Sequence, residues 1–271
     1  MDDLRPTAVA GRFYPRDPEA LRAVVQDLLG EIEVPRSPVR GAIVPHAGYL
    51  YSGTSAAQVF SRIEWTPTVV LLAPNHTGLG NAFASAWSKG AFETPLGAVP
   101  VAEEFIARLE ERSDLVRDDR VAHLKEHAVE VELPFLAHLA PHVSIVPIII
   151  SDVDWESCRQ LAMDLTSVIQ CWPEDVTLLA SSDMTHFQSA QEAQRRDTMA
   201  LECIERLDGK RLLETCRRES ISMCGRAPAA VVLEASKALG ATRAEVVDYR
   251  NSAEVTGDED SVVAYAGIVI R

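Results

Sequence analysis

Short apolar runs alternate along the chain with segments whose apolar residues recur at helical spacing. The runs within 67–78, 143–152 and 175–186 are continuously apolar rather than alternating. Such runs are typical of strands in a sheet that is covered on both faces. A shorter apolar run, 39–46, predicts a strand that enters a turn, and two further strands are predicted at 244–252 and 261–270.

Helical periodicity fills the intervals between these strands. Asp17 and Pro18 are suited to the first turn of a helix over 17–31. The other predicted helices are 53–63, 102–112, 123–140 on both sides of Pro134, 155–170, 197–220 and a last one that begins near Arg226. The alternation predicts one α/β domain over residues 1–271, with a central, mostly parallel mixed sheet flanked by helices.

The composition argues against some classes of binding partner. The chain has 26 basic and 40 acidic residues and a formal charge of -14, which argues against nucleic acid or an anionic membrane as partner. No run of about 18 apolar residues predicts a membrane helix, and the acidic N-terminus is unlike a signal peptide. The cysteines are odd in number and have no CxxC spacing, which indicates a reducing, cytoplasmic compartment. They are Cys158, Cys171, Cys203, Cys216 and Cys224.

Polar side chains follow three of the predicted strands. His46 comes after Val44-Pro45, His76 comes after Pro74-Asn75, and Asp183 and His186 follow Leu179-Ala180-Ser181. A single histidine in such a place is most simply a turn residue. Three of them at the carboxyl ends of strands are expected to meet in one crevice. Two imidazoles with an anionic third ligand would suit iron, zinc or copper.

Cys224 is the candidate third ligand. It precedes the helix that begins near Arg226, and a helix N-terminus favours the thiolate. Cys224 is therefore expected to be the most reactive of the five thiols, unless it is only a small buried apolar residue. Asp183 and His186 are three residues apart and could orient an imidazole or shuttle a proton, although an aspartate there could also cap a turn.

A second pattern points to a different enzyme. Residues 123–127 read HLKEH, which matches the H-x-x-E-H pattern of a class of zinc peptidases. On a helix, His123 and His127 would share a face and Glu126 would be the base. The simpler interpretation is a solvated helix face that carries Glu126, Glu130 and Glu132, and we expect His123 not to bind metal.

Taken in order, several motifs resemble the Memo family over essentially the whole chain. They are AGRFYP, VPHAGYLYSG, APNHTG, EHAVEVELPFL, SSDMTHF, MCGRAP and YRNSAEVTGDEDSVVAYAG. The resemblance implies a fold similar to class III extradiol dioxygenases, which are non-haem iron enzymes. It also implies that His46, His76 and Cys224 form the metal site. His186 would then be the base-like histidine, with Asp183 and His127 lining the same cleft as further catalytic residues.

The resemblance also sets expectations about cofactor and partners. Iron(II) is the expected metal, with copper or zinc as alternatives. Cys224 stands where the dioxygenases have a carboxylate, which makes the site softer. Bacterial and archaeal members of the family are grouped with an AMMECR-type protein and a radical SAM protein, which are the expected protein partners.

Three functions remain open from the sequence. The first is a metal-dependent redox enzyme that acts on a small molecule or a peptide. The second is a non-catalytic module that reuses the cleft to bind a peptide or a protein. The third is the zinc peptidase.

Overall fold

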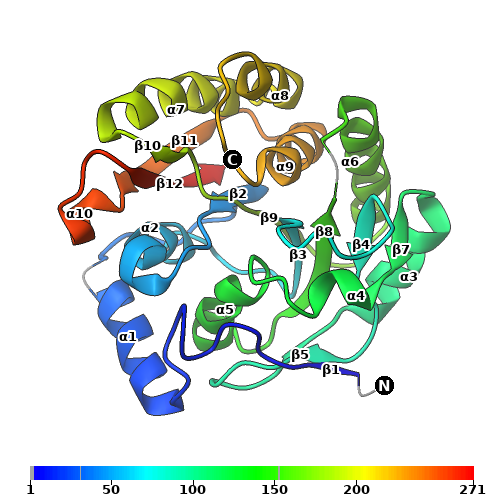
Figure 1. Ribbon diagram of the computed structural model, residues 1–271. Helices are drawn as coiled ribbons and strands as arrows, with labels where there is room; N and C mark the ends of the chain where they lie inside the picture. Colours follow the sequence, from blue (N-terminus) through cyan, green and yellow to red (C-terminus); the bar gives the residue numbers. More distant parts are fainter. Residues whose placement is uncertain (1–2, 31, 152) are drawn as a thin grey trace.

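A mixed sheet forms the centre of the computed structural model, which describes residues 3–30, 32–151 and 153–271 (Figure 1). Within these residues the strand order is β10-β12-β2-β9-β3-β8-β4-β7, and β11 pairs with β12. The strands are β2 (Gly41–Val44), β3 (Thr68–Pro74), β4 (Ala84–Ala86), β7 (Val116–Asp118), β8 (Ser144–Ile150), β9 (Val176–Ser181), β10 (His186–Gln188), β11 (Ala244–Asn251) and β12 (Val262–Ile270). The α/β class predicted from the sequence is confirmed.

The four central strands, β2, β9, β3 and β8, run parallel to one another. They consist almost entirely of buried residues, as the continuous apolar runs predicted. Antiparallel pairs lie outside them, where β12 pairs with β2 and β11, and β4 pairs with β8. In the parallel register Val44 lies beside Ser181, so β2 and β9 end side by side.

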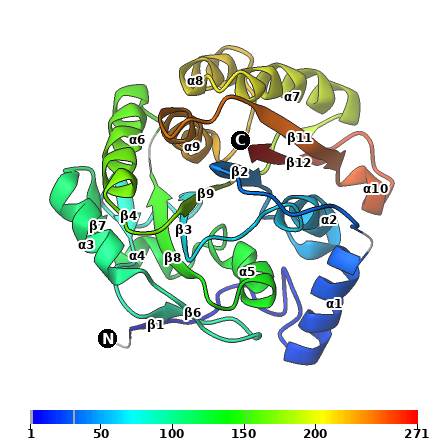
Figure 2. The ribbon, with the colours of Figure 1, turned by 180° about the vertical axis from the view of Figure 1, so that it is seen from behind.

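Helices cover both faces of this sheet. Figures 1 and 2 show α6 to α9 on one face, and α1, α2 and α5 on the other. The helices are α1 (Pro18–Gly30), α2 (Tyr49–Phe60), α3 (Glu103–Arg112), α4 (Arg120–His123), α5 (Leu133–Leu139), α6 (Trp155–Gln170), α7 (Ala190–Glu205), α8 (Gly209–Arg218), α9 (Arg226–Ala238) and α10 (Ala253–Thr256). Among the described residues, no helix is both long and apolar enough to cross a membrane.

Two predicted helices are interrupted. The predicted helix over 197–220 is divided into α7 and α8, because Leu207 has a φ of 53° and the Asp208 carboxylate caps α8 at the backbone N–H of Arg211. The predicted helix over 123–140 is also wrong in its first half. There α4 ends at His123, residues 124–129 form a loop, and a 3₁₀ turn at Glu130–Glu132 leads into α5.

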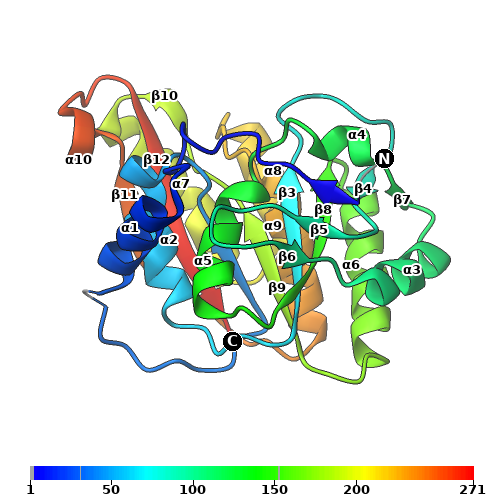
Figure 3. The same cartoon turned by 90° about the horizontal axis from the view of Figure 1, so that it is seen from below.

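A buried arginine ties the N-terminal segment to this loop. β1 (Leu4–Arg5) joins β5 (Ala91–Phe92) and β6 (Val99–Pro100) in a small second sheet (Figure 3). Arg5 is fully buried, forms an ion pair with Glu130, and donates hydrogen bonds to the backbone carbonyls of His123 and Glu126. Glu130 also accepts hydrogen bonds from the backbone of Ala8 and Val9 and from the hydroxyl of Tyr14. This network holds the loop at residues 124–129 in place.

Candidate metal centre

The candidate centre lies where β2, β3 and β9 end. Because these three strands are parallel, their carboxyl ends reach the same edge of the sheet. His46 follows β2 after Pro45, and its backbone N–H donates to Asp183 Oδ1 at 2.8 Å. His76 follows β3, where the Asn75 side chain accepts from the next turn. The sequence therefore predicted correctly that these residues share one edge.

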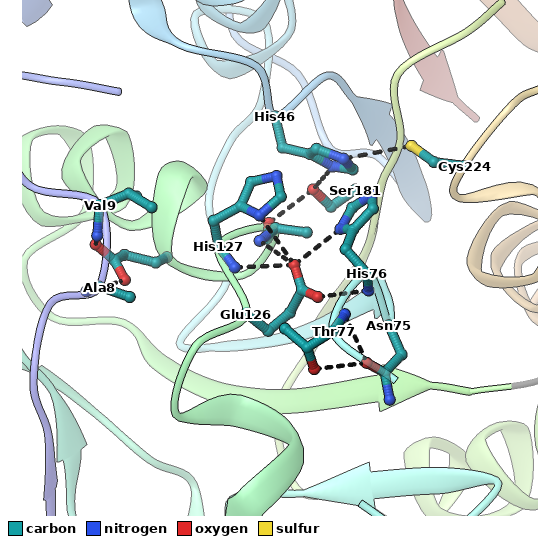
Figure 4. A network of polar contacts seen from close by, with 12 residues as sticks. Ala8, Val9, His46, Asn75, His76, Thr77, Glu126, His127, Ser181 and Cys224 are labelled. Carbon is teal, nitrogen blue, oxygen red and sulfur yellow. Dashed lines mark hydrogen bonds and ion pairs between the residues drawn. The ribbon is translucent and has the colours of Figure 1, made fainter. Parts of the chain in front are cut away.

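Three histidines gather at this edge. One ring nitrogen from each of His46, His76 and His127 lies within 4.8 Å of the other two. The ring centroids are 5.1 Å apart for His46 and His76, 5.4 Å for His46 and His127, and 4.7 Å for His76 and His127. Figure 4 shows the three rings turned toward one another, although His127 comes from the loop after α4 and not from a strand end.

Glu126 holds two of these rings. Its Oε1 lies 2.9 Å from Nδ1 of His76 and 3.2 Å from Nδ1 of His127, and its Oε2 accepts the backbone N–H of His76 at 2.6 Å (Figure 4). Burial would raise the pKa of Glu126, but the hydrogen bond with His76, the charges of His76 and His127 and the backbone N–H of Ala128 together lower it. An ionised carboxylate on Nδ1 fixes the ring and leaves Nε2 free as a metal ligand.

His46 is held by a hydroxyl instead. Its Nδ1 lies 2.7 Å from Ser181 Oγ, and its Nε2 lies 3.3 Å from Cys224 Sγ (Figure 4). A tetrahedral zinc with N and S ligands would place these two atoms roughly 3.5 Å apart. Cys224 and His46 are therefore close enough to share one ion.

The charge states of the histidines favour metal binding. Burial lowers the pKa of His46 well below its usual range, and the nearby imidazoles of His127 and His76 add to this effect. Burial also lowers the pKa of His127, although Glu126 opposes it. Burial would lower the pKa of His76, but the hydrogen bond with Glu126 and the charges of Glu126 and Asp183 together raise it. His46 and His127 are therefore neutral at pH 7, the form in which imidazole binds metal.

Asp183 and His186 lie beside the cluster. Burial raises the pKa of Asp183 to about 6, against the hydrogen bond from the backbone of His46. His186 is only half-buried, and its Nδ1 lies 3.1 Å from the Ser222 carbonyl. A carbonyl only accepts, so Nδ1 carries the hydrogen, and in the neutral form of the ring the lone pair is on Nε2.

The expected thiolate at Cys224 is not found. Burial raises the pKa of this thiol, and the nearby charge of Asp183 raises it further. The Arg226 guanidinium donates to the Met223 carbonyl. Gly225 brings the segment close to β9, because a Cβ there would lie 2.3 Å from the Ser181 carbonyl oxygen. The close approach that positions Cys224 thus also leaves this residue only partly exposed, and desolvation of the thiol outweighs the helix N-terminus.

This burial reverses the labelling pattern expected from the sequence. At pH 7, iodoacetamide is expected to alkylate Cys171, which is exposed, at least about tenfold faster than Cys224 in the metal-free protein, because only the thiolate reacts. Peptide mass spectrometry after timed quenching measures both rates. Faster labelling of Cys224 would show that its thiolate is stabilised after all.

Comparison with known proteins supports the resemblance noted in the sequence. The family model for Memo-like proteins matches residues 5–269. A MEMO1 family protein of Aquifex aeolicus is 41% identical over 98% of both chains. Another, from Methanopyrus kandleri, is 38% identical over 98% of this chain and 99% of its own. The chain belongs to the Memo family.

In this Memo-family chain, most of the predicted site residues lie together. His46, His76, His127, Asp183 and Cys224 are joined by the contacts described above. His186 lies further along the same segment, in β10. The roles expected of these residues, with His46, His76 and Cys224 as metal ligands, remain predictions.

The peptidase pattern does not form a site of its own. His123 is fully buried, and its Nε2 lies 2.9 Å from the Ser85 carbonyl. Burial lowers its pKa to about 4. Because residues 124–129 are not helical, His123 and His127 do not share a helix face.

The prediction of a solvated helix face is wrong for three glutamates, Glu126, Glu130 and Glu132. All three carboxylates are buried. Glu126 orients His76 and His127, and Glu132 Oε1 lies 2.8 Å from Ser181 Oγ, behind His46. Ser181 was also missed. The only local signal was that Glu130 and Glu132 alternate with valine in an otherwise apolar segment, VEVELPF.

The buried Glu132 has a consequence for stability. Burial raises its pKa well above the usual range, and the charge of Asp183 adds to this although Ser181 opposes it. Below the unfolded-state pKa, near 4.5, both states are protonated. Above it only the folded state keeps the proton, so the free energy of unfolding falls by about 1.4 kcal/mol per pH unit until the folded pKa is reached.

Glu132→Gln removes this titration. The unfolding free energy of the variant minus that of the wild type is expected to rise with pH from about 4.5 upward. Urea denaturation at one-unit intervals from pH 4 to 8 measures the difference. A difference that does not change with pH would mean that Glu132 is ionised in the folded protein.

Proposed function

We propose that the chain is a metal-dependent redox enzyme whose metal is held by His46, His76 and Cys224, with His127 within reach of the same ion. The observation that carries the proposal is the cluster of three imidazoles at the ends of parallel strands. Iron is the metal favoured here, with copper or zinc as alternatives. Bound iron or copper would supply one-electron chemistry at this edge of the sheet.

The donor set fits such an ion. Each imidazole has its Nδ1 next to an oxygen, from Ser181 for His46 and from Glu126 for His76 and His127. Outer partners of this kind are typical of metal-binding histidines. The Cys224 thiol next to His46 Nε2 adds a soft ligand once its proton is lost.

Two further side chains can move protons. Asp183, with a pKa of about 6, exchanges a proton near neutral pH. The lone pair on His186 Nε2 can accept a proton from a substrate hydroxyl, while the Ser222 carbonyl holds the other side of the ring. His186 is partly open to solvent, so a substrate can reach it.

His186→Ala tests this role. In anaerobically purified protein loaded with Fe(II), oxygen consumption with a panel of catechols is expected, and the variant should slow it by about 10²-fold or more. Its iron content should not change, because His186 is not a proposed ligand. His142→Ala is the matched control, since His142 is exposed. Oxygen consumption that is independent of iron would refute the redox proposal, and equal rates in His186→Ala and His142→Ala would refute the role of His186.

A groove beside the centre favours a second candidate function, binding of a peptide or a protein. The groove has a volume of about 480 Å³, and its lining includes Phe13, Tyr49 and the exposed Leu50. The Phe13 ring lies 4.9 Å from that of His127, so an apolar side chain bound there would lie next to the cluster. A pure binding module would keep its affinity in His46→Ala.

The AMMECR-type protein and the radical SAM protein are the partners proposed from the family resemblance. Mixing each purified protein with this chain and measuring a complex by size-exclusion chromatography tests the proposal. Repeating the measurement with Leu50→Asp would show whether the groove is the contact surface.

A further inference from the structure

The Ser181 hydroxyl has more partners than hydrogens. Its Oγ lies 2.7 Å from His46 Nδ1, 2.7 Å from the Ala128 carbonyl oxygen and 2.8 Å from Glu132 Oε1. Ser181 and Glu132 are fully buried, and His46 is nearly so. Figure 4 shows the His46 ring between the Ser181 hydroxyl and the Cys224 sulfur, with a contact to each.

Counting hydrogens fixes the direction of each bond. A hydroxyl has one hydrogen and two lone pairs. The Ala128 carbonyl can only accept, so it takes the Ser181 hydrogen. The other two partners must then donate, which places a hydrogen on His46 Nδ1 and another on Glu132 Oε1.

An ionised Glu132 fits these contacts poorly. If Ser181 donated to Glu132 instead, two oxygens would face each other at 2.7 Å with no hydrogen between them. Glu132 Oε2 is also buried without a hydrogen-bond partner among the described residues, which is costly for a carboxylate. Whether Ser181 donates to the Ala128 carbonyl or to Glu132, its single hydrogen does not point to His46. His46 Nδ1 must therefore donate to Ser181 Oγ.

We propose that Ser181 is a positioning residue that fixes His46 as the Nδ1–H tautomer, with Glu132 as a neutral carboxylic acid donating to the same hydroxyl. The lone pair of His46 then lies on Nε2, toward Cys224 Sγ at 3.3 Å. Nε2 is ready to bind metal before any ion arrives. The effect of this tautomer on metal affinity rests on the metal site proposed above. The tautomer itself does not depend on that site.

The histidine tautomer can be measured without any metal. Long-range ¹H–¹⁵N correlation spectra of the ¹⁵N-histidine-labelled, metal-free protein distinguish protonated from unprotonated ring nitrogens, and His46→Gln assigns the His46 signals. Wild type and Glu132→Gln, whose amide can still donate to Ser181, should show hydrogen on Nδ1. Ser181→Ala should show a mixture of tautomers. The control is Ser236→Ala, which removes another buried hydroxyl, one with no partner among the described residues.

The same variants are titrated with Zn²⁺ against a chromophoric chelator. Ser181→Ala should bind Zn²⁺ roughly 10- to 100-fold more weakly than wild type, and Ser236→Ala should match wild type. Hydrogen on Nε2 of His46 in the wild type, or an unchanged tautomer in Ser181→Ala, would overturn the inference. If Ser181→Ala does not fold, the wild-type spectrum alone still decides. If the tautomer is as proposed but no variant binds Zn²⁺, the metal site fails while the role of Ser181 stands.

Discussion

Replacing Arg5 with alanine is expected to lower the free energy of unfolding by about 3–5 kcal/mol, the cost of breaking a buried ion pair by removing one partner. Arg5 and Glu130 are both fully buried. Without the guanidinium, Glu130 would be a buried carboxylate without its ion-pair partner. The backbone carbonyls of His123 and Glu126 would also lose a donor, so the loop with His127 should loosen.

Denaturant unfolding followed by circular dichroism measures this loss. Arg40→Ala is the matched control, because the ion pair between Arg40 and Asp175 is exposed and its loss should cost less than about 1 kcal/mol. Adding Glu130→Gln to Arg5→Ala should recover part of the stability, since it removes the unpaired charge. A loss from Arg5→Ala no larger than that of the control would contradict the role given to this network.

His46→Ala is expected to weaken Zn²⁺ binding by more than about 100-fold, the upper end of what losing an outer partner costs. His46 is the central residue of the site, because its ring faces His76, His127 and Cys224. Removing it takes away the imidazole that contacts the Cys224 thiol. Metal content after anaerobic loading and dialysis, measured together with protein concentration, gives the stoichiometry.

His123→Ala is the comparison for this experiment, because it removes a buried histidine that contacts the Ser85 carbonyl and lies outside the cluster. It should keep one bound ion per chain. The metal content of His127→Ala and of Cys224→Ser then shows which of these two side chains contributes more to metal binding. Retention of metal by His46→Ala together with its loss in His123→Ala would instead support the peptidase interpretation.

The strand-end residues could be predicted because local patterns determine them. Continuous apolar runs end at Val44, Pro74 and Ser181, and the carboxyl ends of parallel strands meet at one edge. His46 and His76 follow directly from this rule. Cys224 was predicted from its place before a helix, and the Memo-family resemblance added His127 as a residue of the same cleft.

The loop at 124–129 could not be predicted, because distant residues determine its shape. Its sequence has helical spacing, yet the Glu126 carboxylate accepts the backbone N–H groups of His127 and Ala128. Arg5, more than a hundred residues away in sequence, takes carbonyls that a helix would have used. Tertiary contacts of this kind override helix propensity.

The residues that orient the His46 ring could not be predicted for a similar reason. Ser181 and Glu132 are 49 residues apart in sequence and meet only in the folded chain. A glutamate is usually exposed, so the default interpretation placed Glu132 in solvent. The raised pKa of the Cys224 thiol likewise depends on burial against β9, which the position before a helix does not reveal.

Diffraction from Zn²⁺-soaked crystals at energies above and below the zinc absorption edge tests the central claim most directly. The account predicts one strong anomalous peak about 2.0–2.1 Å from a ring nitrogen of both His46 and His76, and about 2.3 Å from Cys224 Sγ if the thiol has lost its proton. A peak elsewhere in the chain would contradict this account. So would the absence of a peak at this edge of the sheet in crystals soaked at a saturating Zn²⁺ concentration.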